Sequence, residues 1–122
     1  MPDVCVLDSN VIIYLLGGNK NASRICDKKE HFVSEISEIE VLGFDFEDES
    51  DKRKTEYYFS FVKSITLNSR IKDIAISLRR KYKLKLGDSI ICATAIYLDY
   101  SLITADDRLK KIEELQLILF KP

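Results

Sequence analysis

The chain has 122 residues, of which 46% are hydrophobic and 32% charged, with only four glycines and two prolines. This length is typical of one domain and this composition excludes disordered and collagen-like proteins, so we expect residues 1–122 to form a single soluble globular domain. Nineteen basic and twenty acidic residues give a net charge of −1, which by itself supplies no electrostatic case for binding nucleic acid.

The first predicted element is the apolar run Val4–Leu7, which ends at Asp8. A short continuous apolar run is typical of a strand buried on both faces inside a parallel sheet. Ser9 and Asn10 then supply helix-capping chemistry before an apolar segment that a Gly-Gly pair ends. The order predicted here is strand, tight turn and short helix.

The middle of the chain continues to alternate between helix and strand signals. His31, the only histidine, is expected at the surface before a strand, and a catalytic histidine pair is excluded. In chain order we expect a helix at about residues 22–29, a strand at Phe32-Val33, a helix from Ser34 to Phe44, an acidic loop from Asp45 to Asp51, a helix with Tyr58, Phe61 and Val62 on one face, a strand at Ile65–Leu67, and a helix from Ser69 whose apolar stripe ends at Tyr82.

The last third of the chain contains its longest apolar segment, Ile90–Leu98. This segment is apolar nearly all round and too long for an average strand, so it predicts a central buried helix. It is less than half of the roughly 20 residues that cross a bilayer, so we expect no membrane association. A strand at Tyr100–Thr104, a polar helix at Asp106–Glu114 and a closing strand at Leu117–Phe120 follow.

The alternation of strands and helices predicts the fold class. Strands joined through helices form parallel sheets with right-handed crossovers, so we expect an α/β protein: a three-layer α/β/α sandwich with a central, mostly parallel sheet. The three cysteines are far apart, lie in apolar or helical segments and have no CxxC spacing. They are typical of small core residues in a reducing compartment, and with no basic and apolar leader at the amino terminus they predict a cytoplasmic protein.

Acidic residues follow the predicted strands at the edge where α/β proteins bind ligands. Asp8 directly follows the first strand, Asp106 follows the strand that ends at Thr104, and Asp88 stands at the start of the buried helix. Glu40 reaches the same edge only if its helix packs across the first strand. Carboxylates without nearby histidine or cysteine suit Mg²⁺ or Mn²⁺, which organise a phosphodiester and lower the pKa of a bound water.

Each of these carboxylates also has a second interpretation. Asp8, Asp88 and Asp106 all precede a predicted helix, where aspartate is favoured as a cap and by the helix dipole. Glu40 fits a solvent-facing helix position equally well, and Asp107 competes with Asp106 for either role. Ordered as a group, however, these residues belong to a recognisable pattern.

Four motifs in order resemble the PIN domain: VLDSNVI at residues 6–12, SEIEVLG at 37–43, LGDSIICATA at 86–95 and LITADD at 102–107. The resemblance covers almost the whole chain, and the length most resembles VapC-type toxins, the ribonuclease halves of prokaryotic toxin–antitoxin pairs. It implies a metal-dependent endoribonuclease with Mg²⁺ or Mn²⁺ as cofactor. It also implies an RNA substrate, a cognate antitoxin that covers the site, and a homodimer.

The resemblance assigns roles to individual residues. The acidic quartet is Asp8, Glu40, Asp88 and Asp106; Asp8, Asp88 and Asp106 are the metal ligands, and Asn10 and Thr104 are supporting polar residues.

Departures from the pattern leave some assignments open. Glu35 and Glu38 compete with Glu40 for the second position, although the following Val-Leu-Gly favours Glu40. Arg108 stands where many relatives carry a further acid, and Ser9 either donates a hydrogen bond within the site or caps the helix.

A basic segment precedes the third motif. Residues 63–85 contain eight basic side chains and one acidic one, which suits a track for the RNA backbone or, equally, a solvated helix face. Tyr57, Tyr58 and Phe59 suit base stacking, but at helical spacing they are more typical of core or dimer contacts. The candidate RNA-binding residues are Arg79, Arg80, Lys81, Lys83 and Lys85.

Three hypotheses for function follow. The leading one is a toxin-like endoribonuclease that cleaves RNA by metal-activated water. The second is a non-catalytic PIN-like module that binds RNA or protein. The third, an aspartyl-phosphate enzyme, ranks well behind because the chain lacks the second strand-end aspartate and the late lysine that such sites use.

Overall fold

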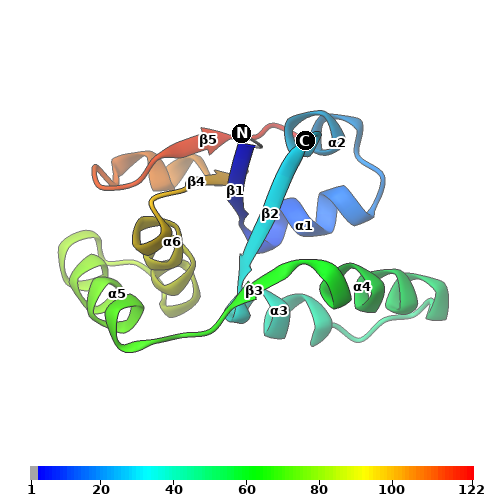
Figure 1. Cartoon of the computed structure of the whole chain (residues 1–122), viewed down its shortest axis with the longest axis horizontal. Coiled ribbons are helices and arrows are strands. Elements are labelled where there is room, and N and C mark those ends of the chain that lie inside the picture. Colours follow the sequence, from blue (N-terminus) through cyan, green and yellow to red (C-terminus); the bar gives the residue numbers. More distant parts are fainter. Residues whose placement is uncertain (1–2) are drawn as a thin grey trace.

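Strands and helices alternate along residues 3–122, the part of the chain that the computed structural model describes (Figure 1). In chain order the elements are β1 (Asp3–Leu7), α1 (Ser9–Leu16), α2 (Lys20–Cys26), β2 (Lys29–Ser34), α3 (Glu35–Leu42), α4 (Glu49–Phe61), β3 (Lys63–Ile65), α5 (Ser69–Tyr82), α6 (Leu86–Leu98), β4 (Ser101–Thr104), the 3-10 helix η1 (Asp107–Lys111) and β5 (Leu117–Leu119).

The five strands form one sheet in the order β3-β2-β1-β4-β5, and every neighbouring pair is parallel. Successive side chains of a strand point to opposite faces, so Val6 and Leu102 pack with α5 and α6. Leu7 and Ile103 pack on the other face with α1, α2 and α4. The predicted three-layer sandwich with a parallel sheet is therefore confirmed.

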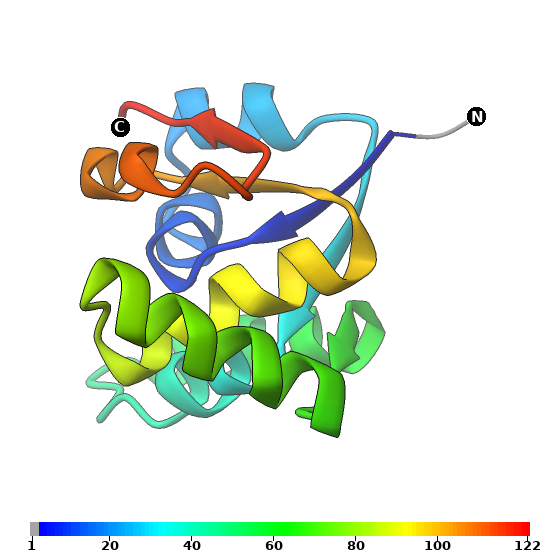
Figure 2. The ribbon, with the colours of Figure 1, turned by 90° about the vertical axis from the view of Figure 1, so that its left-hand side faces the viewer.

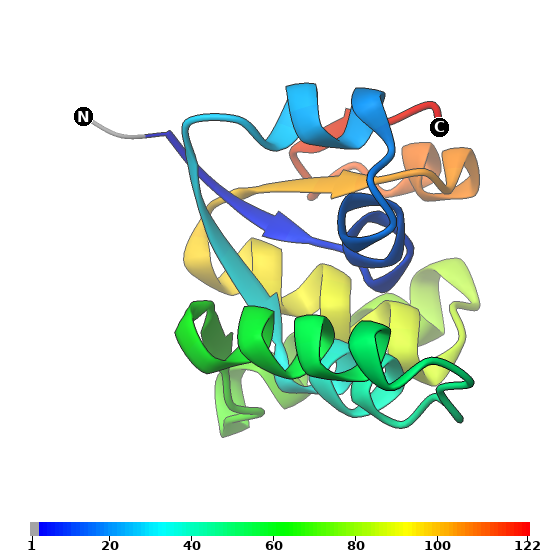
Figure 3. The same cartoon turned by 90° about the vertical axis from the view of Figure 1, so that its right-hand side faces the viewer.

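The chain reverses its direction of travel across the sheet between β1 and β4. From β1 it adds β2 and β3 on one side, and it then returns to place β4 and β5 on the other. β1 and β4 are paired neighbours that run toward the same end, where α1 and η1 begin (Figure 3). Such a switch point leaves a crevice beyond the carboxyl ends of the strands, which is the usual ligand site of open parallel sheets.

Helix α6 is the most deeply buried helix and confirms the prediction of a central apolar helix. Its residues 89–95 are all buried, because α6 lies between the sheet and α5, which covers it (Figure 2). The Thr94 hydroxyl donates to the Ile90 carbonyl, so this buried polar group is satisfied within the helix. The first turn of α6 is thereby held firmly at the carboxyl edge of the sheet.

Several predicted boundaries move. The second strand runs over Lys29–Ser34 rather than Phe32-Val33, because the whole segment pairs with β1 or β3. The third strand lies at Lys63–Ile65, two residues earlier than predicted. The acidic loop ends at Asp48, whose side chain caps α4. The polar helix predicted for Asp106–Glu114 is instead the 3-10 helix of residues 107–111.

One side-chain prediction held in part and another was wrong. On α4, Tyr58 is buried, Val62 packs against the same core cluster and the Phe61 ring lies 5.7 Å from that of Tyr58, but Phe61 itself is 62% exposed and Phe59 is buried instead. His31 lies inside β2 and is half-buried, with one ring nitrogen 3.1 Å from the Cys26 carbonyl and the other 3.2 Å from the Tyr58 hydroxyl. A neighbouring helix supplies a polar partner for His31 that sequence spacing does not reveal.

All three cysteines are buried free thiols, as predicted. Burial raises the pKa of each thiol well above its ordinary value, which favours the unreactive protonated form. No helix within residues 3–122 is long and apolar enough to cross a membrane.

Candidate active site

Asp8 is the most buried carboxylate of the site. It follows β1 directly, is 5% exposed, and caps α1 by accepting a hydrogen bond from the Ser9 backbone N–H at 2.8 Å. Burial raises its pKa from 3.8 to about 6, opposed by donation from Thr104 and Ser9 and reinforced by the negative charges of Asp88 and Glu40. Capping and a place in the site are therefore compatible for this residue.

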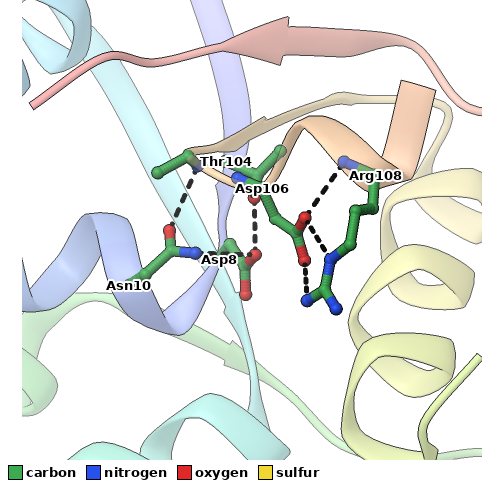
Figure 4. A network of polar contacts seen from close by, with 6 residues as sticks. Asp8, Asn10, Thr104, Asp106 and Arg108 are labelled. Atoms are coloured by element: carbon green, nitrogen blue, oxygen red, sulfur yellow. Dashed lines mark hydrogen bonds and ion pairs between the residues drawn. The ribbon is translucent and has the colours of Figure 1, made fainter.

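Thr104 and Asn10 connect Asp8 to the end of β4 (Figure 4). The buried Thr104 hydroxyl donates to Asp8 Oδ2 at 2.7 Å and accepts from the Asp106 backbone N–H at 3.0 Å. The Asn10 carbonyl oxygen accepts from the Ala105 N–H at 3.3 Å, and its amide lies 3.5 Å from Asp8 Oδ2. Thr104 and Asn10 thus connect the end of β1 to the end of β4, the two strands that flank the switch point.

Glu40 reaches the site because α3 packs against both α1 and α6. Its Oε1 accepts from the Ser9 hydroxyl at 2.7 Å, and a Cβ built on Gly87 would lie 3.4 Å from its Oε2. The competing acids of the same helix point elsewhere: Glu38 accepts from the Ser64 hydroxyl and Glu35 from the Leu67 N–H. The structure therefore favours Glu40 as the second acid and shows Ser9 acting as a hydrogen-bond donor to it.

Asp88 lies in the first turn of α6, one turn beyond the Lys85 cap position, and its side chain does not cap the helix. The capping interpretation of Asp88 was therefore wrong. Its pKa is raised by partial burial and by the negative charge of Asp106, while Arg108 and Lys85 oppose the rise. Asp88 is therefore close enough to Asp106 and Glu40 for their charges to affect its pKa.

Asp106 caps η1 and is bound by a guanidinium from its own turn (Figure 4). Arg108 Nε and Nη2 donate to its two carboxylate oxygens at 2.9 and 2.8 Å, and the Arg108 backbone N–H donates to Oδ1 at 3.0 Å. These contacts lower the pKa of Asp106, so it stays ionised. Asp107, by contrast, is exposed, which favours Asp106 as the fourth acid.

The carboxylate oxygens of the site have the chemistry that a hard divalent cation prefers, but the four side chains are not close enough together to coordinate one in this arrangement. Four carboxylates supply oxygen ligands, and buried Asp8 has no cationic partner among the ion pairs of residues 3–122. Within the same residues, no three acidic, histidine or cysteine side chains lie close enough together to hold an ion. Two of the acids are already hydrogen-bonded: Arg108 donates to both carboxylate oxygens of Asp106, and the Ser9 hydroxyl donates to Glu40.

The five candidate RNA-binding residues do not gather at one place. Lys83 and Lys85 line a hollow of about 120 Å³ beside Asp88 and Asp106. Arg79 instead donates through Nε to the Leu84 carbonyl and so supports the turn between α5 and α6. The remaining two, Arg80 and Lys81, line a separate open depression along α5, and Lys81 pairs with Glu114 at 3.5 Å.

The structure places two basic residues at the site that the sequence did not predict there. Lys111 lines the hollow with Lys83 and Lys85, and Arg108 binds Asp106. The sequence marks Arg108 only as a departure from the acidic pattern, and nothing in it marks Lys111, whose position depends on how η1 packs.

The carboxylates at the switch point of a parallel sheet define a PIN-type acidic site, and the family comparison agrees. The PIN domain family model matches residues 5–115, so this chain belongs to the PIN domain family. The recognition made from the four motifs is thereby confirmed.

Similar proteins include a ribonuclease and chains of toxin–antitoxin complexes. Ribonuclease VapC2 of Methanocaldococcus jannaschii is 28% identical, with 91% of this chain and 90% of that protein covered. A toxin–antitoxin complex from Klebsiella pneumoniae contains a chain with a TM-score of 0.81 and 26% identity, covering 93% of this chain and 95% of that one. VapBC2 of Rickettsia felis, at 17% identity and a TM-score of 0.84, covers 97% of this chain and 99% of its own and shares the fold.

Proposed function

We propose that this chain is a metal-dependent endoribonuclease that hydrolyses RNA phosphodiester bonds with Mg²⁺ or Mn²⁺, and that it is the toxin of a type II toxin–antitoxin pair. The observation that supports this most strongly is that carboxylates from four separate segments lie at one sheet edge in a member of the PIN family. The similarity to a ribonuclease and to a toxin–antitoxin complex supports the substrate class and the biological setting.

In this proposal Asp8, Asp88 and Asp106 hold the cation through their oxygens, with Glu40 beside them. A bound divalent cation would neutralise charge that develops on the phosphodiester and lower the pKa of an attacking water. Asp8 is oriented by Thr104 and by the Ser9 N–H, so its carboxylate is fixed before any ligand arrives. Its buried charge lacks a compensating cation, which favours binding of one.

The test compares two aspartates at opposite ends of α6. Asp88→Asn should lower RNA cleavage by about 100-fold or more, because even indirect partners of metal ligands contribute about 10- to 100-fold. Asp99→Asn is the matched control: Asp99 is exposed, ends α6 with a φ of 58°, and asparagine tolerates this conformation. Labelled RNA is incubated with the purified proteins in Mn²⁺, in Mg²⁺ and in EDTA, and circular dichroism checks the fold.

Three results would contradict the proposal in distinct ways. Equal cleavage in EDTA removes the metal dependence, and full activity of Asp88→Asn removes the site assignment. RNA binding without cleavage under any metal condition would instead indicate the non-catalytic module. For the toxin role, expression of the chain should arrest growth, and co-expression of a small adjacent gene should relieve the arrest.

A further inference from the structure

Arg108 is the one cation in residues 3–122 that directly binds a carboxylate of the acidic quartet. Its guanidinium meets Asp106 side by side, with one nitrogen on each oxygen (Figure 4). Each oxygen therefore has a lone pair in use and a full positive charge beside it. In this arrangement Asp106 is a poor ligand for a second cation, because the two positive charges repel each other.

The same arginine also faces the hollow beside the site. Its side chain is 69% exposed, whereas that of Asp106 is 17% exposed. Four cations and two carboxylates line this hollow: Lys83, Lys85, Arg108, Lys111, Asp88 and Asp106. The excess of positive charge suits a phosphate of a nucleic-acid backbone, and a guanidinium binds phosphate with the same two-pronged geometry that it uses for carboxylate.

Resting on the function proposed above, we propose that Arg108 exchanges partners: it binds Asp106 in the free protein and a backbone phosphate of RNA in the complex. The exchange frees both oxygens of Asp106 for the divalent cation at the moment when substrate is present. Because the Arg108 side of the pair is 69% exposed, water screens the ion pair and can solvate the released guanidinium, which keeps the cost of the exchange low. Arg108 thereby links RNA binding to completion of the cation site.

The exchange predicts opposite effects of one substitution on two ligands. Arg108→Gln removes the competing charge from Asp106, so the protein without RNA should bind Mn²⁺ about two- to fivefold more tightly. The same substitution removes a phosphate contact, so in EDTA it should bind a labelled RNA about tenfold more weakly. The slope of log RNA affinity against log salt concentration should also become shallower by about one for this variant.

Two further variants separate charge from geometry. Arg108→Lys keeps the charge but loses the two-pronged fork, so it should weaken RNA binding without reproducing the full gain in Mn²⁺ affinity. Lys110→Gln is the matched control, because Lys110 lies on the same 3-10 helix, is exposed and does not line the hollow. It should leave Mn²⁺ binding unchanged. Mn²⁺ affinity is measured by calorimetry and RNA affinity by fluorescence anisotropy.

The outcomes separate this inference from the proposed function. Weaker Mn²⁺ binding by Arg108→Gln would show that Arg108 orients Asp106 as a fixed structural partner, which overturns the exchange. Unchanged RNA affinity and salt dependence would overturn it as well, even if the protein cleaves RNA as proposed. If the unsubstituted protein binds neither Mn²⁺ nor RNA, the exchange and the proposed function fail together.

Discussion

Replacing Asp8 by asparagine should make the metal-free protein more stable, by an amount that grows with pH. Burial raises the pKa of Asp8 from 3.8 to about 6. A carboxyl whose pKa is raised by folding favours the folded state in its protonated form, and this contribution is lost as pH rises through the folded pKa. Asparagine does not ionise, so the free energy of unfolding of the variant has no such loss as the pH rises.

The size of the effect follows from the shift. Each unit of pKa difference corresponds to about 1.4 kcal/mol, so ionising buried Asp8 costs ~3 kcal/mol once the pH is well above 6. At pH 4 only a small part of that cost is present, because the folded protein keeps Asp8 protonated. The stability of Asp8→Asn relative to the unsubstituted protein should therefore rise by ~2 kcal/mol between pH 4 and pH 8.

The assay is urea unfolding of both proteins in EDTA at several pH values, followed by circular dichroism. Comparing the two proteins at each pH cancels the titration of groups that both share. A difference in unfolding free energy that stays constant with pH would refute the reasoning, since it would mean that Asp8 ionises in the folded protein without cost. A variant that is more stable yet inactive would show that the buried charge serves function at the expense of stability.

Two further predictions concern the neighbours of Asp8 and Glu40. Thr104→Val removes the hydroxyl that donates to Asp8 Oδ2, so the pKa of Asp8 should rise above about 6. Carboxyl ¹³C NMR titration in EDTA measures this pKa, and an unchanged titration midpoint would contradict the role of Thr104. In Gly87→Ala the added Cβ would lie 3.4 Å from Glu40 Oε2, so this variant should keep both stability and activity. Gly87→Leu should instead displace Glu40 and lower cleavage, and equal activity of the two variants would contradict a role for Glu40.

Much of the framework could be predicted from the sequence because it depends on local patterns. The apolar run before Asp8 and the all-apolar helix after Asp88 can be buried only inside a layered structure, and strands separated by helices must run parallel. Carboxyl ends of parallel strands meet at one edge, which predicts that Asp8 and Asp106 share a site. Boundaries moved where pairing with a neighbouring strand extended or shifted an element, as at β2.

The choice of partner for each polar side chain was decided by the tertiary structure. Glu35, Glu38 and Glu40 lie on one helix within six residues, and only the packing of α3 against α1 and α6 brings Glu40, rather than the other two, to Ser9 and Gly87. Lys83 and Lys85 face the site while other members of the same basic segment do not, because the turn into α6 redirects the chain.

The sequence by itself therefore determined the order of the elements, the parallel sheet and the edge at which the acids gather, since these depend on hydrophobic periodicity and chain connectivity. The tertiary structure decided which acid of α3 reaches the site and accepts from Ser9, that His31 is bound between α2 and α4, and that Arg108 holds Asp106. These are outcomes of competition among donors and acceptors from distant segments, and that competition depends on distances that only packing sets.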